Sequence, residues 1–125
     1  MKDESRQWLT YADENLQGAH LLLESELFNL VLQNVQQAVE KMLKSMLVEK
    51  GVKFPKTHSV NELCAMLRQH GVLVPIDDDE RDLLDSIYLP SKYPFDSSLP
   101  DFEPNAATCV RCIEVAQRVR DSIGQ

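Results

Sequence analysis

The sequence is poor in the residues that mark sheets, membrane spans and secreted disulfide scaffolds. Only 4 of its 125 residues are glycine, and valine and isoleucine are sparse outside stretches with helical periodicity. No window approaches the roughly 20 apolar residues that span a bilayer, and the start of the chain has no apolar signal core. The 3 cysteines are an odd number, which favours free thiols over disulfides. We therefore expect an all-α protein in the cytoplasm.

Positive charge is also in deficit. The 13 lysines and arginines are outnumbered by 20 aspartates and glutamates, so the formal net charge is −7. General binding to nucleic acids depends on basic side chains that neutralise phosphates and release counterions. The composition therefore argues against a general affinity for nucleic acids, although it is compatible with a local basic patch.

The residues that are present favour one globular domain spanning residues 1–125. The composition is 43% hydrophobic and 26% charged, which is ordinary for a folded protein of this size. Apolar positions recur at helical spacing and predict five helices: about Ser5 to Leu23, about Leu27 to Lys50, from a Ser59 cap to a Gly71 stop, from Asp77 to a residue before Pro90, and from an Asn105 cap to about Ile123. These segments predict an up-and-down four-helix bundle with an additional short helix.

The sequence also predicts how some of these helices begin, end and pack. Ser59 and Glu62 are spaced as a capping box, and Gly51 is expected to end the second helix. In the fifth helix, Glu114 and Arg118 are spaced as an exposed ion pair. Its inward face is expected to hold Ala106, Val110, Ile113, Ala116, Val119 and Ile123.

Polar residues on the second helix form a strip opposite its apolar arc. Glu40 and Lys44 are one turn apart and are expected to form an ion pair. The strip is either a solvated surface or a set of hydrogen-bonding groups for a ligand or a facing helix. Its members are Gln33, Gln36, Gln37, Glu40 and Lys44.

The turn before the third helix contains Lys56, Thr57 and His58. The His58 imidazole is either a structural hydrogen-bonding group at a helix entrance or a contact for a phosphate. Lys56 is either a solvated charge or an anion contact. We keep both residues as binding candidates.

A proline-rich stretch from Leu89 to Pro104 also carries aromatic residues, and this combination predicts an ordered loop. Tyr88 and Tyr93 could stack on a base while Lys92 meets a phosphate. They could equally pin the loop to the core.

Cys109 and Cys112 form a CxxC pattern without the further ligands that a structural zinc site needs. The sequence also lacks a glycine-rich phosphate loop and a nucleophile elbow. We therefore predict no metal and no cofactor, and expect both thiols to pack as small hydrophobic groups.

The sequence resembles the HEPN family over nearly the whole chain, in the ordered combination of Trp8 with Ala12, Gln36 to Lys44, Gly51, Lys56 to Leu63 and Tyr88 to Pro94. That resemblance implies a helical bundle that often forms a homodimer. It also implies a place beside a minimal nucleotidyltransferase, or a role as a toxin that cleaves RNA.

Members of that family with RNase activity carry an arginine, four to six residues and then a histidine, after the fourth helix. The three histidines here are His20, His58 and His70, and all precede Tyr88. Where the family often has Arg-Tyr-Pro, this chain has Lys92-Tyr93-Pro94, and lysine lacks the planar fork of arginine. The resemblance therefore implies a chain without this enzymatic activity.

The hypothesis that follows is a non-catalytic module that binds a nucleotide or a partner, such as the substrate-binding subunit of a two-protein nucleotidyltransferase or toxin–antitoxin system. The alternative is an RNA-cleaving toxin with a non-standard site of His58, Lys92 and Tyr93. A third hypothesis is a helical dimerisation or scaffolding unit. The candidate ligand-binding residues are Gln37, Glu40, Lys44, Lys56, His58, Tyr88, Lys92 and Tyr93.

Overall fold

A computed structural model describes residues 1–92 and 104–124 of the chain. Its five helices are α1 (Asp3–Glu24), α2 (Phe28–Glu49), α3 (Val60–Gln69), α4 (Asp78–Lys92) and α5 (Ala106–Ile123). No strand occurs in the described ranges, and the all-α prediction with one short helix is confirmed. None of these helices is both long enough and apolar enough to cross a membrane.

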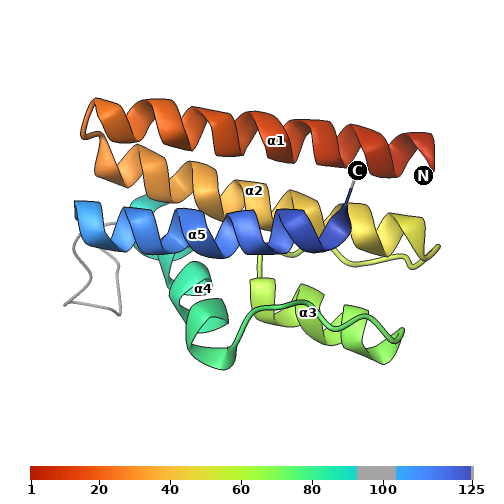
Figure 1. The fold of residues 1–125 in the computed structure, drawn as a ribbon. Coiled ribbons are helices and arrows are strands. Elements are labelled where there is room, and N and C mark those ends of the chain that lie inside the picture. The colour runs from red at the N-terminus through yellow and green to blue at the C-terminus, as the bar shows by residue number, and fades with distance from the viewer. Residues whose placement is uncertain (93–103, 125) are drawn as a thin grey trace.

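The helix α2 is the centre of the bundle. It contacts the four other helices, whereas α1 contacts α2 and α5. In Figure 1, α1, α2 and α5 run alongside one another, and α3 and α4 lie on the side of α2 away from α1. The central position explains why α2 is buried nearly all round, and why polar residues on it face protein rather than water.

The apolar arc of α2 forms the middle of the core. Many of its side chains have no measurable exposure, and Leu63 and Leu67 of α3, Leu84 and Ile87 of α4, and Ala116 and Val119 of α5 close around it. Burial of one such side chain stabilises the fold by about 2 kcal/mol. The fully buried residues of α2 are Val31, Leu32, Val35, Ala38, Val39, Met42, Leu43 and Leu47.

Two helices end in the glycine motif that the sequence predicts. After α2, the Gly51 amide donates to Val48 and the Val52 amide donates to Leu47. The same pair of bonds recurs after α3 around Gly71. Both glycines have positive φ, at 71° and 80°, a conformation that glycine adopts without steric cost.

The capping predictions are confirmed at Ser59 and Asn105 but not in every detail. The Ser59 hydroxyl accepts from the Glu62 amide, and the Asn105 side chain accepts from the Thr108 amide. The Glu62 carboxylate does not complete a reciprocal box, because it accepts from the Thr57 hydroxyl instead. A reciprocal box does occur at α4, which the sequence reading missed.

That box joins Asp77 and Glu80. The Asp77 amide donates to the Glu80 carboxylate over 3.0 Å, and the Glu80 amide donates to Asp77 Oδ1 over 2.8 Å. Arg118 of α5 also donates to Glu80 over 2.8 Å. The expected pair of Arg118 with Glu114 is therefore wrong, because a buried carboxylate on a neighbouring helix provides the stronger partner.

Two further expectations are corrected. The helix α4 continues through Pro90 to Lys92, because a proline in the last turn removes a single backbone bond, here the one to the Ser86 carbonyl. In α5, Ala106 is exposed and Val110 is 44% exposed. Ile113, Ala116 and Val119 are buried as predicted, and Cys109, Cys112 and Val115 also face the core.

Candidate functional site

The Glu40 carboxylate lies halfway along α2 and is almost fully buried, with 3% of the residue exposed. Its Oε2 accepts from the Lys44 ammonium over 2.9 Å, and its Oε1 lies 3.0 Å from Nδ1 of His58. Lys44 is itself only 8% exposed. The predicted ion pair of Glu40 and Lys44 is confirmed, but the reading of the strip as a solvated surface is wrong for both residues.

Two aromatic rings surround the Lys44 ammonium. Its Nζ lies 5.5 Å from the centroid of the Trp8 ring and 5.8 Å from that of Phe54. The negative face of an aromatic ring attracts a cation at such distances. Trp8 comes from α1 and Phe54 from the segment after α2, so these rings cover the charge from outside the helix that carries it.

Gln36 joins the strip to the turn that carries His58. Its side-chain amide donates to the His58 carbonyl over 3.1 Å and to Glu40 over 3.4 Å. The Gln37 amide donates to Gln36 Oε1 over 2.8 Å. The amides therefore bond within the protein and fix the backbone at His58.

His58 presents its ring at the surface, and its side chain is 51% exposed. The ring stacks on Tyr88 of α4, with centroids 4.6 Å apart and planes at 14°. Because Glu40 engages Nδ1, the ring orientation is fixed and Nε2 points away from that carboxylate. Within the described chain, Nε2 makes no hydrogen bond.

The position of the His58 turn also depends on Asp85 of α4. Its carboxylate accepts from the Ser59 hydroxyl over 3.0 Å and from the amides of Val60 and Asn61 over 2.5 Å and 3.1 Å. An acidic side chain from another helix thus caps α3 at its positive end. Asp85 and Tyr88 are one turn apart, so the same part of α4 anchors the turn and stacks on its histidine.

The structure brings together Gln37, Glu40, Lys44, His58 and Tyr88 from the predicted set. We call these five residues with Gln36 the His58 cluster. Lys56 is exposed and, within the described residues, forms no hydrogen bond or ion pair with the cluster. Lys92 is the last residue of α4, one turn beyond Tyr88, and its side chain lies outside the described part, as does the whole of Tyr93.

The sequence reading missed the covering rings Trp8 and Phe54 and did not count Gln36 as a site residue. The wide apolar arc of α2 was a sequence signal that the charged pair of Glu40 and Lys44 is buried. No local pattern around Trp8 or Phe54 relates these rings to Lys44.

The cysteines belong to the core and not to this site. Cys109 and Cys112 have no measurable exposure, which confirms that they pack as small hydrophobic groups. Burial raises the pKa of Cys112 to about 12, and it also raises the pKa of Cys109. Among residues 1–92 and 104–124, no three histidine, cysteine or acidic side chains gather closely enough to hold a metal ion.

Comparisons with known proteins agree with this architecture. TT1696 from Thermus thermophilus is similar over 96% of this chain and 95% of its own, with 24% identity and a TM-score of 0.78. ST0689, described as an archaeal HEPN homologue, is similar over 98% of this chain and 96% of its own, with 22% identity and a TM-score of 0.68. At these identities the likeness shows the fold.

No curated protein matches the chain significantly. The sequence model of the HEPN domain, in contrast, matches residues 5–125, which is nearly the full length and includes all the helices that carry the His58 cluster. The chain therefore belongs to the HEPN domain family.

Proposed function

We propose that this chain is a non-catalytic binding module and that the His58 cluster binds the phosphate of a nucleotide. The observation that supports this is the half-exposed His58 ring, which a buried carboxylate holds by Nδ1. A histidine oriented in this way is prepared to hydrogen-bond an incoming group through Nε2. A phosphate oxygen accepts such a bond once the ring is protonated.

The buried side of the cluster supports binding more than it supports catalysis. The Lys44 ammonium contacts the same carboxylate as His58, but Glu40 and two rings cover it. It therefore contributes to the local field without reaching a substrate. A rigid, preorganised first contact lowers the entropy cost of binding a ligand.

The family suggests the setting in which such binding is useful. We propose a homodimer that acts as the substrate-binding subunit beside a minimal nucleotidyltransferase, as in two-protein toxin–antitoxin systems. In that setting the His58 cluster would hold the nucleotide and the partner would carry out the transfer.

The test is a melting-temperature titration with ATP, GTP, CTP and UTP, because a ligand that binds only the native state must stabilise it. At a concentration about 100 times the Kd, the free energy of unfolding rises by about 2.7 kcal/mol. The variant His58→Gln should lose this rise. His20→Gln changes an exposed histidine of α1 and should retain it.

The proposal is abandoned if no nucleotide shifts the melting temperature and the protein also fails to associate with a nucleotidyltransferase encoded beside it. A dimer by mass measurement with neither property would favour a dimerisation or scaffolding unit instead. Equal shifts in both histidine variants would place the nucleotide elsewhere.

One observation favours a second candidate, an RNA-cleaving enzyme. The 3.0 Å contact of Glu40 with Nδ1 of His58 is the arrangement by which a carboxylate orients a histidine that transfers protons. The family pair of arginine and histidine is absent, so the site would be non-standard. Structured and single-stranded RNA should then be cut by the protein and not by His58→Ala, and equal cutting by the two proteins rejects this function.

A further inference from the structure

A cavity of about 410 Å³ lies apart from the His58 cluster, between α3 and the segment that leads to α4. It shares no residue with the cluster. Volumes of this size hold small organic molecules. The cavity is lined by Asn61, Cys64, Ala65, Arg68, Gln69, Val72, Leu73, Val74, Ile76 and Arg81.

The charge of this lining is unusual for the chain. Acidic residues outnumber basic ones by 20 to 13 over the whole sequence, yet the cavity has two arginines and no carboxylate. Burial raises the pKa of Cys64 to about 11, so its thiol is neutral near pH 7. The lining therefore carries positive charge only.

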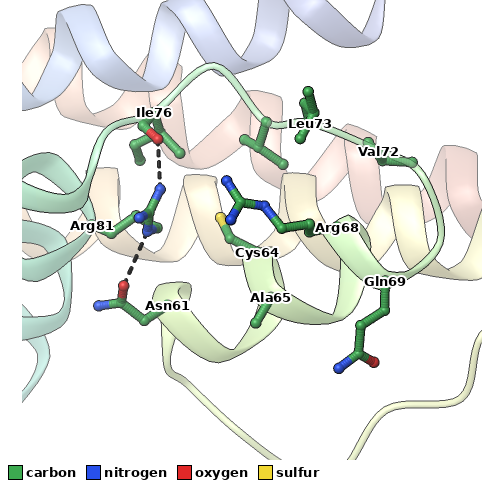
Figure 2. A pocket seen from close by; sticks show the side chains of 10 residues that line it. Asn61, Cys64, Ala65, Arg68, Gln69, Val72, Leu73, Ile76 and Arg81 are labelled. Carbon is green, nitrogen blue, oxygen red and sulfur yellow. Dashed lines mark hydrogen bonds between the residues drawn. The ribbon is translucent and has the colours of Figure 1, made fainter.

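The two arginines differ in their partners. The Arg81 guanidinium donates to the Ile76 carbonyl over 2.7 Å and to Asn61 Oδ1 over 3.0 Å, and it pairs with the Asp78 carboxylate. Figure 2 shows these bonds to Asn61 and Ile76 at one end of the cavity. Arg81 is thus held in place by protein groups.

Arg68 has no such partner, since its guanidinium makes no hydrogen bond or ion pair within the described ranges. In Figure 2 its side chain extends from α3 toward the end of the cavity where Arg81 lies. An unpaired guanidinium presents a planar fork of donors that matches an oxyanion. It is the free recognition group of this cavity.

The remaining wall is apolar. Ala65, Val72, Val74 and Ile76 line it, and Leu73 lies at its rim with 75% of the residue exposed. A ligand that covers apolar surface of this kind gains binding free energy. An occupant should therefore combine an apolar body with a negative group.

We propose that this cavity is a binding site for a small organic anion, with its carboxylate or phosphate on Arg68 and its apolar body against Leu73 and the segment before α4. The site is independent of the proposed nucleotide site, so either one can fail without the other.

The experiment uses phenyl phosphate and benzoate as anionic probes and benzyl alcohol as the uncharged control. In a ¹H–¹⁵N NMR titration, the two anions should shift the amides of residues 61–76 saturably, with dissociation constants below roughly 10 mM. The comparison of the two anions shows which oxyanion the site prefers. Binding of benzyl alcohol with the same affinity would overturn recognition of charge.

The variant Arg68→Gln should weaken binding at least about tenfold and should fold, because it removes no bond within the protein. Arg111→Gln removes the same charge from an exposed position on α5 and should bind within about twofold of the original. Ala65→Leu, which adds three carbon atoms to the lining without a change of charge, should also weaken binding.

The His58→Gln variant should bind both anions unchanged. Besides equal binding of benzyl alcohol, any one of three further results overturns the proposal: no saturable shift, equal binding by the Arg68 and Arg111 variants, or full binding by Ala65→Leu.

Discussion

Charged side chains that leave water need several partners at once, and Glu40 and Lys44 have them. The carboxylate is shared by an ammonium, an amide and an imidazole, and the ammonium is covered by two rings. Desolvation of two such ions costs several kcal/mol each, and mutual attraction offsets it only when the geometry is good. The pair is therefore a weak stabiliser as a whole, but each member depends strongly on the other.

The variant Glu40→Gln should lower the free energy of unfolding by about 3 kcal/mol, because it leaves the Lys44 ammonium buried without a counter-charge. Urea denaturation measures this as a lower midpoint with an unchanged slope. The double variant Glu40→Gln with Lys44→Met should return to within about 1 kcal/mol of the original. A single variant as stable as the original would show that the pair is hydrated.

Glu80 carries the clearest dependence of stability on pH. The hydrogen bond from Arg118 lowers the pKa of this carboxyl from its ordinary value of 4.5, and the Asp77 amide lowers it further, whereas burial opposes both. A lowered folded-state pKa means that the unfolded chain takes up the proton first. The stabilisation is complete above pH 4.5 and is lost as the pH falls through the folded-state pKa.

We expect Glu80→Gln to be less stable than the original protein at pH 7 and to show a smaller loss between pH 5 and pH 3. Urea midpoints at several pH values measure the two curves, and their difference isolates Glu80 from the other carboxylates. Parallel curves over that range would contradict the role given to Arg118.

At the scale of the elements, the hydrogen bonds of Asp85 attach the start of α3 to α4. A helix of 10 residues is marginal alone, and Asp85 satisfies amides at its start that would otherwise lack partners. The variant Asp85→Ala should lower the free energy of unfolding by about 2 kcal/mol. Hydrogen exchange should show the loss of protection concentrated in α3.

Asp82→Ala is the matched control, because Asp82 is exposed and, among the residues that the structure describes, accepts only from the Asn61 side chain. Its effect should stay below about 0.5 kcal/mol. Equal effects of the two variants would mean that general charge near α3 matters and that the cap does not.

Most of the elements were predictable from the sequence, but the partner of Arg118 was not. Periodicity identified five helices, and the caps at Ser59 and Asn105 marked two of their starts. The choice of Arg118 between Glu114 and Glu80 depends on which helices become neighbours. Local sequence does not contain that information.

At the scale of the molecule, the same limit applies to the site. Glu40, Lys44 and His58 were identifiable from spacing, because an i, i+4 charge pair and a histidine at a helix entrance are local patterns. The burial of Glu40 and Lys44 was not, since the cover over Lys44 includes Trp8, which is 36 positions from Lys44 in the sequence. The resemblance to the family supplied the topology, but it did not supply these partners.

The three thiols provide a measure of how the whole molecule opens. All are buried, and burial raises the pKa of Cys64 to about 11. Iodoacetamide at pH 8 should therefore modify the native protein far more slowly than the urea-unfolded protein, in which all three react. In Asp85→Ala, Cys64 of α3 should react before Cys109 and Cys112. Rapid labelling of the original protein would contradict this packing.

The placement of Trp8 beside the Lys44 ammonium has an optical consequence. The chain has one tryptophan, and a cation 5.5 Å from an indole ring changes the energy of its excited state. Any ligand that draws Glu40 toward His58 changes the field that the indole senses. The unlabelled protein should therefore signal occupancy of the His58 cluster by its own emission, even though Trp8 itself touches no ligand.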